Sequence, residues 1–423
     1  MAEKIKMSSK ITKISARQIL DSRGNPTVEV TVFTDTDFAI ASVPSGASTG
    51  SHEAFELRDG GKSFGGKSVL KAINNIEKKI LPKIRGKSIF DQQEIDDAMI
   101  LLDGTSNKQR LGANAILAVS IAIARLGSQL KNQTLYSYLA SSYDFPKPKS
   151  VPTPLFNVFN GGLHADSGTD VQEFFFIPKL GKFEKKVETA WIAINSLKKV
   201  LQKKNLSTAV GDEGGFASKT HSNEKTFRLL KLAIQESGLR LGKDIAMGID
   251  AAATEFFDAD KQVYNLRADR KTFKPSSIYR LYSRWSKNYH LEIIEDGCSE
   301  DDYLGWQKLT ENLGPQFTLV GDDLFVTNQE RLHNGIITGL ANAVLIKPNQ
   351  IGTVSETMDT IQLAKKFKYK VVISHRSGET SDDFIADLSA AVGADYIKAG
   401  SLARGERLAK YNRLLKIAEE LKV

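Results

Sequence analysis

The 423-residue sequence has a single cysteine, Cys298, and lacks any long apolar run. One cysteine excludes an intrachain disulfide and a thiolate zinc site. The longest nearly apolar stretch, residues 111–124, is shorter than the roughly 20 residues that a membrane-spanning helix needs, and we interpret it as a buried helix. No apolar segment follows the positively charged N-terminus, so the sequence predicts no secretory signal and a cytoplasmic location.

The composition also excludes a disordered or collagen-like chain. Apolar residues make up 41% of the sequence, and its glycines and prolines show no triplet period. The net charge of +8 can attract nucleic acid or an anionic membrane. The lysines are spread over many predicted helices, however, and no stretch joins them to interleaved aromatic residues or to a nucleic-acid motif. We therefore expect a basic surface without a dedicated nucleic-acid or membrane partner.

The first third of the chain shows strand patterns followed by helical patterns. Val28, Val30 and Val32 alternate with polar residues, which predicts a half-buried strand, and a turn near 35–37 leads into a second strand at 38–43. Apolar residues at helical spacing then predict helices near 69–81, 92–103 and 111–128. A stretch with several prolines at 141–154 breaks the periodicity. These patterns predict a smaller N-terminal α+β domain over residues 1–141.

Short apolar runs alternate with helical stretches over residues 142–423. Six of these runs end in a charged residue or a histidine, at Asp250, Glu295, Asp322, Lys347, His375 and Lys398. Four of the five gaps between them are 23 to 28 residues long, which fits one strand and one helix per unit. We therefore predict an α/β fold in which this region is a (β/α)8 TIM-like barrel with its chemistry at the carboxyl ends of the strands. A doubly wound open sheet is the alternative, but it does not need functional residues at six consecutive strand ends.

Three of the strand ends carry carboxylates. A barrel mouth brings Asp250, Glu295 and Asp322 together, and three oxygen ligands without histidine or cysteine favour a hard cation such as Mg²⁺. The alternative is that each acid merely caps the following helix. Caps need not alternate with lysines at strand ends, so the sequence favours the metal site.

The other strand ends and two glycine-rich segments complete the predicted site. A lysine beside other cations in a dry pocket can act as a base, and histidine, arginine and serine together suit a phosphate. A carboxylic acid in a glycine-rich loop can approach a ligand closely and protonate a leaving hydroxide. The candidates are Lys347, Lys398, the His375–Arg376–Ser377 set, His164, Gln172 and Glu173 in segment 160–174, and Glu213 in segment 210–216. Together they predict proton abstraction from a phosphorylated substrate beside a metal-bound carboxylate.

Six motifs resemble those of the enolase family and follow one another in the family's order. They are SGASTG at 45–50, NGGLHA at 160–165, VGDEGG at 210–215, GDDLFVTN at 321–328, IKPNQIGT at 346–353 and SHRSGET at 374–380. The resemblance implies a lyase of glycolysis and gluconeogenesis that reversibly dehydrates 2-phosphoglycerate to phosphoenolpyruvate with two Mg²⁺ ions per site. It also implies a cytoplasmic homo-oligomer of at least two subunits, with an additional pool at the cell surface or outside the cell.

The family's pattern gives each candidate residue a role. Lys347 would take the C2 proton, and Glu213, supported by Glu173, would protonate the departing C3 hydroxyl. The first Mg²⁺, with a structural or conformational role, would bind Asp250, Glu295 and Asp322, and the second, brought with the substrate, would bind Ser48 of the SGASTG lid loop. Substrate contacts are implied for Arg376 and Ser377 on the phosphate, for Lys398 and Gln172 on the carboxylate, and for His164 and His375 as pocket-lining residues.

One motif and two other functions compete with this interpretation. Residues 61–68 match the P-loop pattern, but residues 51–59 carry too many charges for the buried strand that must precede a P-loop, so we expect an exposed loop. The basic surface allows a secondary binding role. The other alternative is that the chain is a different member of the same superfamily, acting on another carboxylic acid. The predicted phosphate-binding set at 375–377 argues against this alternative.

Overall fold

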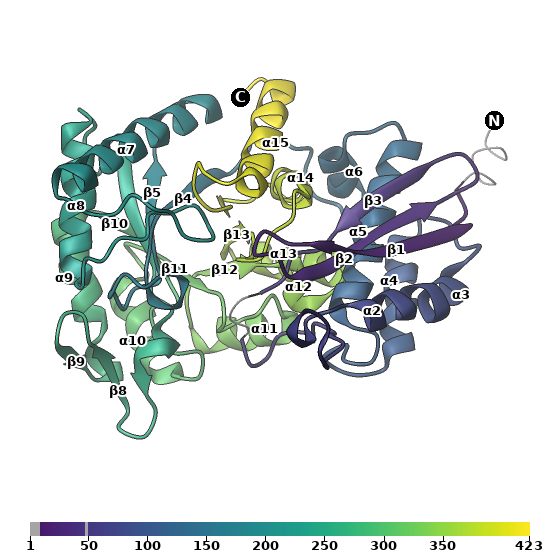
Figure 1. The fold of residues 1–423 in the computed structure, drawn as a ribbon, viewed down its shortest axis with the longest axis horizontal. Helices are drawn as coiled ribbons and strands as arrows, with labels where there is room; N and C mark the ends of the chain where they lie inside the picture. The colour runs from purple at the N-terminus through teal and green to yellow at the C-terminus, as the bar shows by residue number, and fades with distance from the viewer. Residues whose placement is uncertain (1–8, 47–49) are drawn as a thin grey trace.

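The structure is a computed structural model that describes residues 9–46 and 50–423. Its N-terminal part, purple and blue in Figure 1, contains an antiparallel sheet of three strands, β1 (Lys13–Leu20), β2 (Pro26–Phe33) and β3 (Phe38–Ser42). Val28, Val30 and Val32 of β2 are fully buried. The predicted alternating strand and its hairpin partner are therefore confirmed.

Helices of the N-terminal part cover this sheet. They are α2 (Leu70–Asn75), which continues through a π-helical turn (Ile76–Ile80) into α3 (Leu81–Ile84), then α4 (Gln92–Asp103), α5 (Ala113–Leu130) and α6 (Leu135–Ser142). Helix α5 packs on β2 and β3. Among the described helices it is the one long and apolar enough to span a membrane, but 83% of it is buried inside the protein. It is the buried core helix that the sequence predicts.

The segment that resembles a P-loop is an exposed loop. Residues 51–60, all of them described, form no strand, and all but two of residues 61–68 are exposed around a short 3-10 turn, η1 (Ser63–Gly66). A phosphate-binding loop needs a strand that aims it at the ligand. The prediction that this motif is not a P-loop is confirmed.

Residues 153–398 contain a closed barrel of eight strands, the fold that the sequence predicts. Its closure excludes the open doubly wound sheet. In barrel order the strands are β10 (Leu291–Glu295), β11 (Thr318–Gly321), β12 (Ala343–Ile346), β13 (Lys370–Ser374), β14 (Tyr396–Lys398), β4 (Thr153–Asn160), β5 (Glu173–Pro178) and β6 (Ile245–Asp250). Small apolar side chains such as Ala246 and Ala343 fill the interior together with branched ones.

Helices surround the barrel in Figure 1. They are α7 (Phe183–Lys203), α8 (Asn223–Glu236), α9 (Tyr279–Tyr289), α10 (Tyr303–Leu313), α11 (Gln329–Thr338), the short α12 (Pro348–Ile351), α13 (Val354–Lys366), α14 (Phe384–Ala391) and α15 (Gly405–Leu421). The 45-residue gap between Asp250 and Glu295 holds, besides α9, two 3-10 turns (Ala253–Phe256 and Pro275–Ser277) and a small sheet of β7 (Phe257–Asp258), β8 (Val263–Leu266) and β9 (Lys271–Phe273).

The barrel departs from strict alternation of strand and helix at its start. Between β4 and β5 the chain forms only a 3-10 turn, η3 (Gly162–His164), and β5 returns antiparallel to both of its neighbours. Without a crossover helix, consecutive strands can pair only as antiparallel neighbours. Two helices, α7 and α8, then lead to β6. The reversal places the first residue of β5, rather than its last, at the barrel mouth.

Side chains of the N-terminal part cap helix α13 of the barrel part. Oγ of Ser120 accepts the Val354 N–H at 2.9 Å, and Oδ2 of Asp96 accepts the N–H and the hydroxyl of Ser355 at 3.1 and 2.7 Å. Asp96 is fully buried, and burial raises its pKa to about 6. The predicted domain boundary between residues 141 and 142 stays a prediction; α6 ends at Ser142 and β4 begins at Thr153.

Candidate active site

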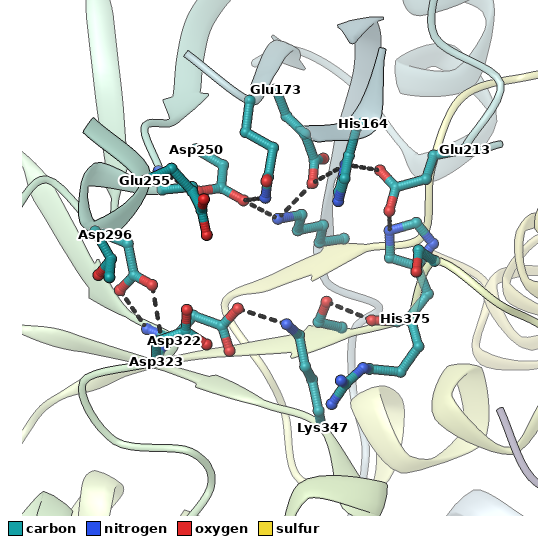
Figure 2. A pocket seen from close by; sticks show the side chains of 17 residues that line it. His164, Glu173, Glu213, Asp250, Glu255, Asp296, Asp322, Asp323, Lys347 and His375 are labelled. Atoms are coloured by element: carbon teal, nitrogen blue, oxygen red, sulfur yellow. Dashed lines mark hydrogen bonds and ion pairs between the residues drawn. The ribbon is translucent and has the colours of Figure 1, made fainter. Parts of the chain in front are cut away.

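A pocket lined mainly by charged and polar side chains lies at the barrel mouth. Figure 2 shows its side chains pointing toward one another from several strands and loops. Eleven of the thirteen predicted site residues line it: His164, Gln172, Glu173, Glu213, Asp250, Asp322, Lys347, His375, Arg376, Ser377 and Lys398. Glu295 is buried against Lys398, and Ser48 lies outside the described residues.

The strand register explains why residues so far apart in sequence meet here. Parallel strands present their carboxyl ends at one rim, and Asp250 and Glu295 are register partners in β6 and β10. Three further strands, β11 to β13, are followed directly by Asp322, Lys347 and His375. Because β5 is reversed, its first residue, Glu173, is the register partner of Asp250.

Lys398 lies at the centre of the carboxylate cluster. Its Nζ lies 3.1 Å from Oδ2 of Asp250, 2.8 Å from Oε1 of Glu295 and 3.1 Å from Oε1 of Glu173. Burial opposes the charge on Lys398, but these carboxylates raise its pKa well above the ordinary value. The single positive charge of Lys398 does not balance the negative charges of three ionised carboxylates. Burial and Asp250 raise the pKa of Glu295, and its Oε2 has no hydrogen-bond partner among the described residues.

Lys347 forms an ion pair with Asp322. Its ammonium donates to Oδ2 of Asp322, and Nε2 of Gln350 donates to Oδ1 at 2.9 Å. Burial opposes both charges, but the pairing raises the pKa of Lys347 and lowers that of Asp322. Thr327 accepts the Lys347 N–H at 2.8 Å and donates to Oε1 of Gln350 at 2.8 Å. The pair is therefore held in place at the strand end.

His164 lies between two buried glutamates. Its Nδ1 is 3.6 Å from Oε1 of Glu173 and 3.5 Å from Oε2 of Glu213. Burial and the nearby Glu213 raise the pKa of Glu173 well above its ordinary value. Burial acts on Glu213 in the same direction, but His164 and His375 outweigh it and hold the pKa of Glu213 well below its ordinary value. Neighbouring acids with pKa values moved apart are typical of acid–base sites.

The tautomer of His375 follows from its contact with Arg407. A guanidinium can only donate, and Nη1 of Arg407 lies 2.7 Å from Nδ1 of His375. Nδ1 therefore accepts, and a neutral ring carries its hydrogen on Nε2, which lies 3.8 Å from Oε1 of Glu213. Burial lowers the pKa of His375 well below its ordinary value, which keeps the ring neutral. His375 is thus a hydrogen-bond donor aimed at Glu213.

The predicted phosphate-binding residues lie together after β13. Nη1 of Arg376 donates to Oε2 of Glu53 at 2.8 Å, and only 3% and 6% of these two side chains are exposed. Oγ of Ser377 is buried and has no hydrogen-bond partner among the described residues. Arg407 donates to the carbonyls of Arg376 and Ser377, both at 2.6 Å. The backbone of this segment is therefore fixed.

The site includes residues that the sequence analysis missed. Asp296 accepts the N–H groups of Asp322 and Asp323 at 2.9 and 3.0 Å, and ligand atoms of these three acids lie within 4.8 Å of one another. Burial and Asp322 raise the pKa of Asp323 to about 8. Asp296 and Asp323 directly follow the predicted ligands Glu295 and Asp322 in the chain. This adjacency is the sequence signal that could have identified them. Thr254 and Glu255 also line the pocket.

Comparisons with known proteins identify the family of the chain. Family models for the enolase N-terminal domain and the enolase C-terminal TIM barrel domain match residues 11–139 and 148–423. An enolase of Mycobacteroides abscessus is 50% identical over 414 residues, which are 97% of this chain and 94% of the relative. With a closed barrel, an N-terminal α+β part and lysines facing carboxylates at the mouth, the chain belongs to the enolase family.

Proposed function

We propose that the protein reversibly dehydrates 2-phosphoglycerate to phosphoenolpyruvate in a Mg²⁺-dependent reaction. One observation carries the proposal: Lys347 and the Glu173–Glu213 pair face one pocket from opposite sides, as Figure 2 shows. Lys347 follows β12 and Glu173 begins β5, and these strands are four positions apart in a barrel of eight. This arrangement supports removal of a proton from one carbon and protonation of a hydroxyl on the next.

The substrate's two charged ends have matching groups in the pocket. Arg376 and Ser377 would bind the phosphate, because the arginine is buried and the serine hydroxyl has no partner within residues 9–46 and 50–423. Lys398 and Gln172 would contact the carboxylate from the other side, where Nε2 of Gln172 lies 3.3 Å from Oδ2 of Asp250. Between these ends, C2 and C3 would lie near Lys347 and Glu213.

Asp250, Glu295 and Asp322 would hold the first Mg²⁺, and Ser48 would contribute to the second. The donor set fits this ion, because the three groups offer only carboxylate oxygens and Oε2 of Glu295 is buried with no hydrogen-bond donor in the described part of the chain. When bound, Mg²⁺ stabilises the negative charge that develops on the substrate carboxylate.

Lys347 would remove the C2 proton, and the electron pair of the broken C–H bond would move toward the carboxylate. The amine must be neutral for this step, whereas Asp322 holds it protonated in this structure. When Asp322 serves as a metal ligand, Lys347 loses that partner. Burial and the neighbouring Arg376 and Lys398 then lower its pKa. The counter-ion of the lysine thus decides whether it can act as a base.

Glu213, supported by Glu173 and His164, would give its proton to the C3 hydroxyl, which leaves as water while the C2–C3 double bond forms. The opposite pKa shifts of the two glutamates support a shared proton that rests on Glu173 in the ligand-free site. His164 lies within 3.6 Å of both, so this proton can reach Glu213 without crossing bulk water. The Nε2–H of His375 would orient the accepting carboxylate.

We further propose a homo-oligomer of at least two subunits in the cytoplasm with an additional cell-surface pool, since the family implies them. Nothing in the described residues favours the alternative of a binding role for the basic surface. The decisive test mixes the purified protein with 2-phosphoglycerate and follows the ultraviolet absorbance of the enol phosphate. We expect absorbance with Mg²⁺, none with a chelator, and recovery when Mg²⁺ is restored. A folded, Mg²⁺-saturated protein that produced no absorbance would refute the proposal.

A further inference from the structure

We propose that Glu53 competes with the substrate phosphate for Arg376, so that phosphate binds by displacing a carboxylate that belongs to the protein. The inference rests on the proposed function, in which Arg376 binds the phosphate. The inference gives Glu53, a residue of the N-terminal part, a role in setting how tightly the phosphorylated substrate binds.

The contact between the two side chains is a buried ion pair. Nη1 of Arg376 and Oε2 of Glu53 are 2.8 Å apart, and both side chains are almost fully shielded from water. The Coulombic attraction within such a pair is stronger than at the surface, because water and salt screen it less, and a buried arginine that loses its partner is left with an uncompensated charge. A guanidinium binds carboxylates and phosphates through the same N–H donors. The group that would bind phosphate therefore already has an anion bound to it.

Neutral donors from two segments hold the other oxygen of Glu53. Oε1 accepts the Gly50 N–H at 3.0 Å and Nε2 of Gln350 at 3.3 Å. The Ala54 N–H donates in turn to the Gln350 carbonyl at 2.8 Å. These contacts direct Oε2 of Glu53 toward the barrel, where it meets Arg376. The carboxylate is built into the site and is not a side chain that reaches the arginine by chance.

The competition has a consequence of definite sign. A phosphate and a carboxylate at one guanidinium repel each other, so Glu53 must move away or weaken the binding of phosphate. If Glu53 served only to hold Arg376 in position, removing its charge would weaken phosphate binding. If it competes, removing its charge strengthens phosphate binding. The direction of the change therefore distinguishes a competitor from a purely structural partner.

The substitution Glu53→Gln tests this, because an amide keeps the size of the side chain and an oxygen for Gly50 and Gln350. Binding of inorganic phosphate to the full-length, Mg²⁺-loaded protein is measured by titration calorimetry. We expect the variant to bind phosphate on the order of tenfold more tightly than the parent. KM for 2-phosphoglycerate should fall in parallel. Glu29→Gln is the matched control, because Glu29 is also a glutamate of the N-terminal part in an ion pair with an arginine, Arg17, and it should change binding less than about threefold.

Weaker or unchanged phosphate binding in Glu53→Gln would overturn the competition. Should this variant not fold, Glu53→Asp gives the same test, because the shorter side chain loosens the contact with Arg376 and should also tighten phosphate binding, by a smaller factor. Failure of the proposed function looks different. In that case phosphate would bind neither to the parent nor to Glu53→Gln, or the substitution Arg376→Gln would leave phosphate binding unchanged. If Arg376→Gln abolishes binding and Glu53→Gln tightens it, both proposals stand.

Discussion

Asp322 at the barrel mouth and Asp96 at the contact between α4 and α13 are both buried carboxylates, yet their pKa values move in opposite directions. Burial raises the pKa of both. At Asp322 the ammonium groups of Lys347 and Lys398 outweigh burial and lower the pKa. The donors to Asp96 are hydroxyl, amide and backbone N–H groups, and the pKa stays raised at about 6. Several neutral donors thus do not offset desolvation here, whereas paired cations do.

The difference separates a site for chemistry from a structural contact. At the mouth, facing acids and cations determine each other's pKa and therefore which groups carry protons. A ligand that binds one partner of a pair also changes the pKa of the other. Lys347, for example, depends on Asp322 for its charge. At the helix contact, Asp96 accepts an N–H group of α13 and, among the described residues, is not paired with a cation. The following experiments alter one side of this comparison at a time.

The largest effect is expected from Lys347→Ala. Without its amine, the site loses the base that we propose for the C2 proton. Exchange of the C2 hydrogen of 2-phosphoglycerate with deuterated water, followed by NMR, should fall by about 10⁴-fold or more. Lys67→Ala, in the exposed loop that resembles a P-loop, is the control and should stay within a few-fold of the parent. Unaltered exchange in Lys347→Ala would remove this lysine as the base.

Glu213→Gln should separate the two proton transfers. The amide cannot protonate the C3 hydroxyl, so dehydration should slow by about 10²- to 10⁴-fold. Exchange at C2 should persist in part, because the anion formed by Lys347 can be reprotonated before hydroxide leaves. Both rates come from one NMR sample that contains 2-phosphoglycerate in deuterated water. If exchange vanished in Glu213→Gln and persisted in Lys347→Ala, the two roles would be reversed.

Asp322→Asn removes the charge of one proposed Mg²⁺ ligand while it keeps the shape of the side chain. Loss of even an outer contact of a metal site weakens binding by about 10- to 100-fold, so Mg²⁺ affinity should fall at least about tenfold. Titration calorimetry with Mg²⁺ measures this without relying on activity. Asp166→Asn, an exposed acid paired with Lys219, is the control. Parental affinity in Asp322→Asn would exclude this residue as a ligand.

The tautomer of His375 makes a smaller, spectroscopic prediction. In protein labelled with ¹⁵N at histidine, Nδ1 should be unprotonated and Nε2 protonated between about pH 6 and 8, since burial lowers the pKa and Arg407 donates to Nδ1. Titration of His375 in this range, or a hydrogen on Nδ1, would contradict the contact with Arg407.

The sequence predicted the barrel and most of the pocket because strand ends are local signals. Asp250, Lys347 and Lys398 each end a short apolar run, and parallel pairing brings such ends to one rim. The reversal of β5 was not predicted, because an apolar run does not reveal the direction of its strand. Glu53 and Arg407 were missed for another reason: their contacts join segments more than 30 residues apart, and no spacing indicates them.

Asp96→Asn tests the structural side of the comparison. Because the folded state raises the pKa of Asp96 from about 3.9 to about 6, it binds a proton more tightly than the unfolded chain does. The stability that this proton contributes is fully present below about pH 4 and is lost as the pH rises through 6, by up to about 3 kcal/mol. The introduced amide carries no charge at any of these pH values. Relative to the parent, the free energy of unfolding of the variant, measured with urea, should therefore increase between pH 4 and 7. A difference that did not change with pH would mean that Asp96 is ionised in the fold and that neutral donors alone offset its burial.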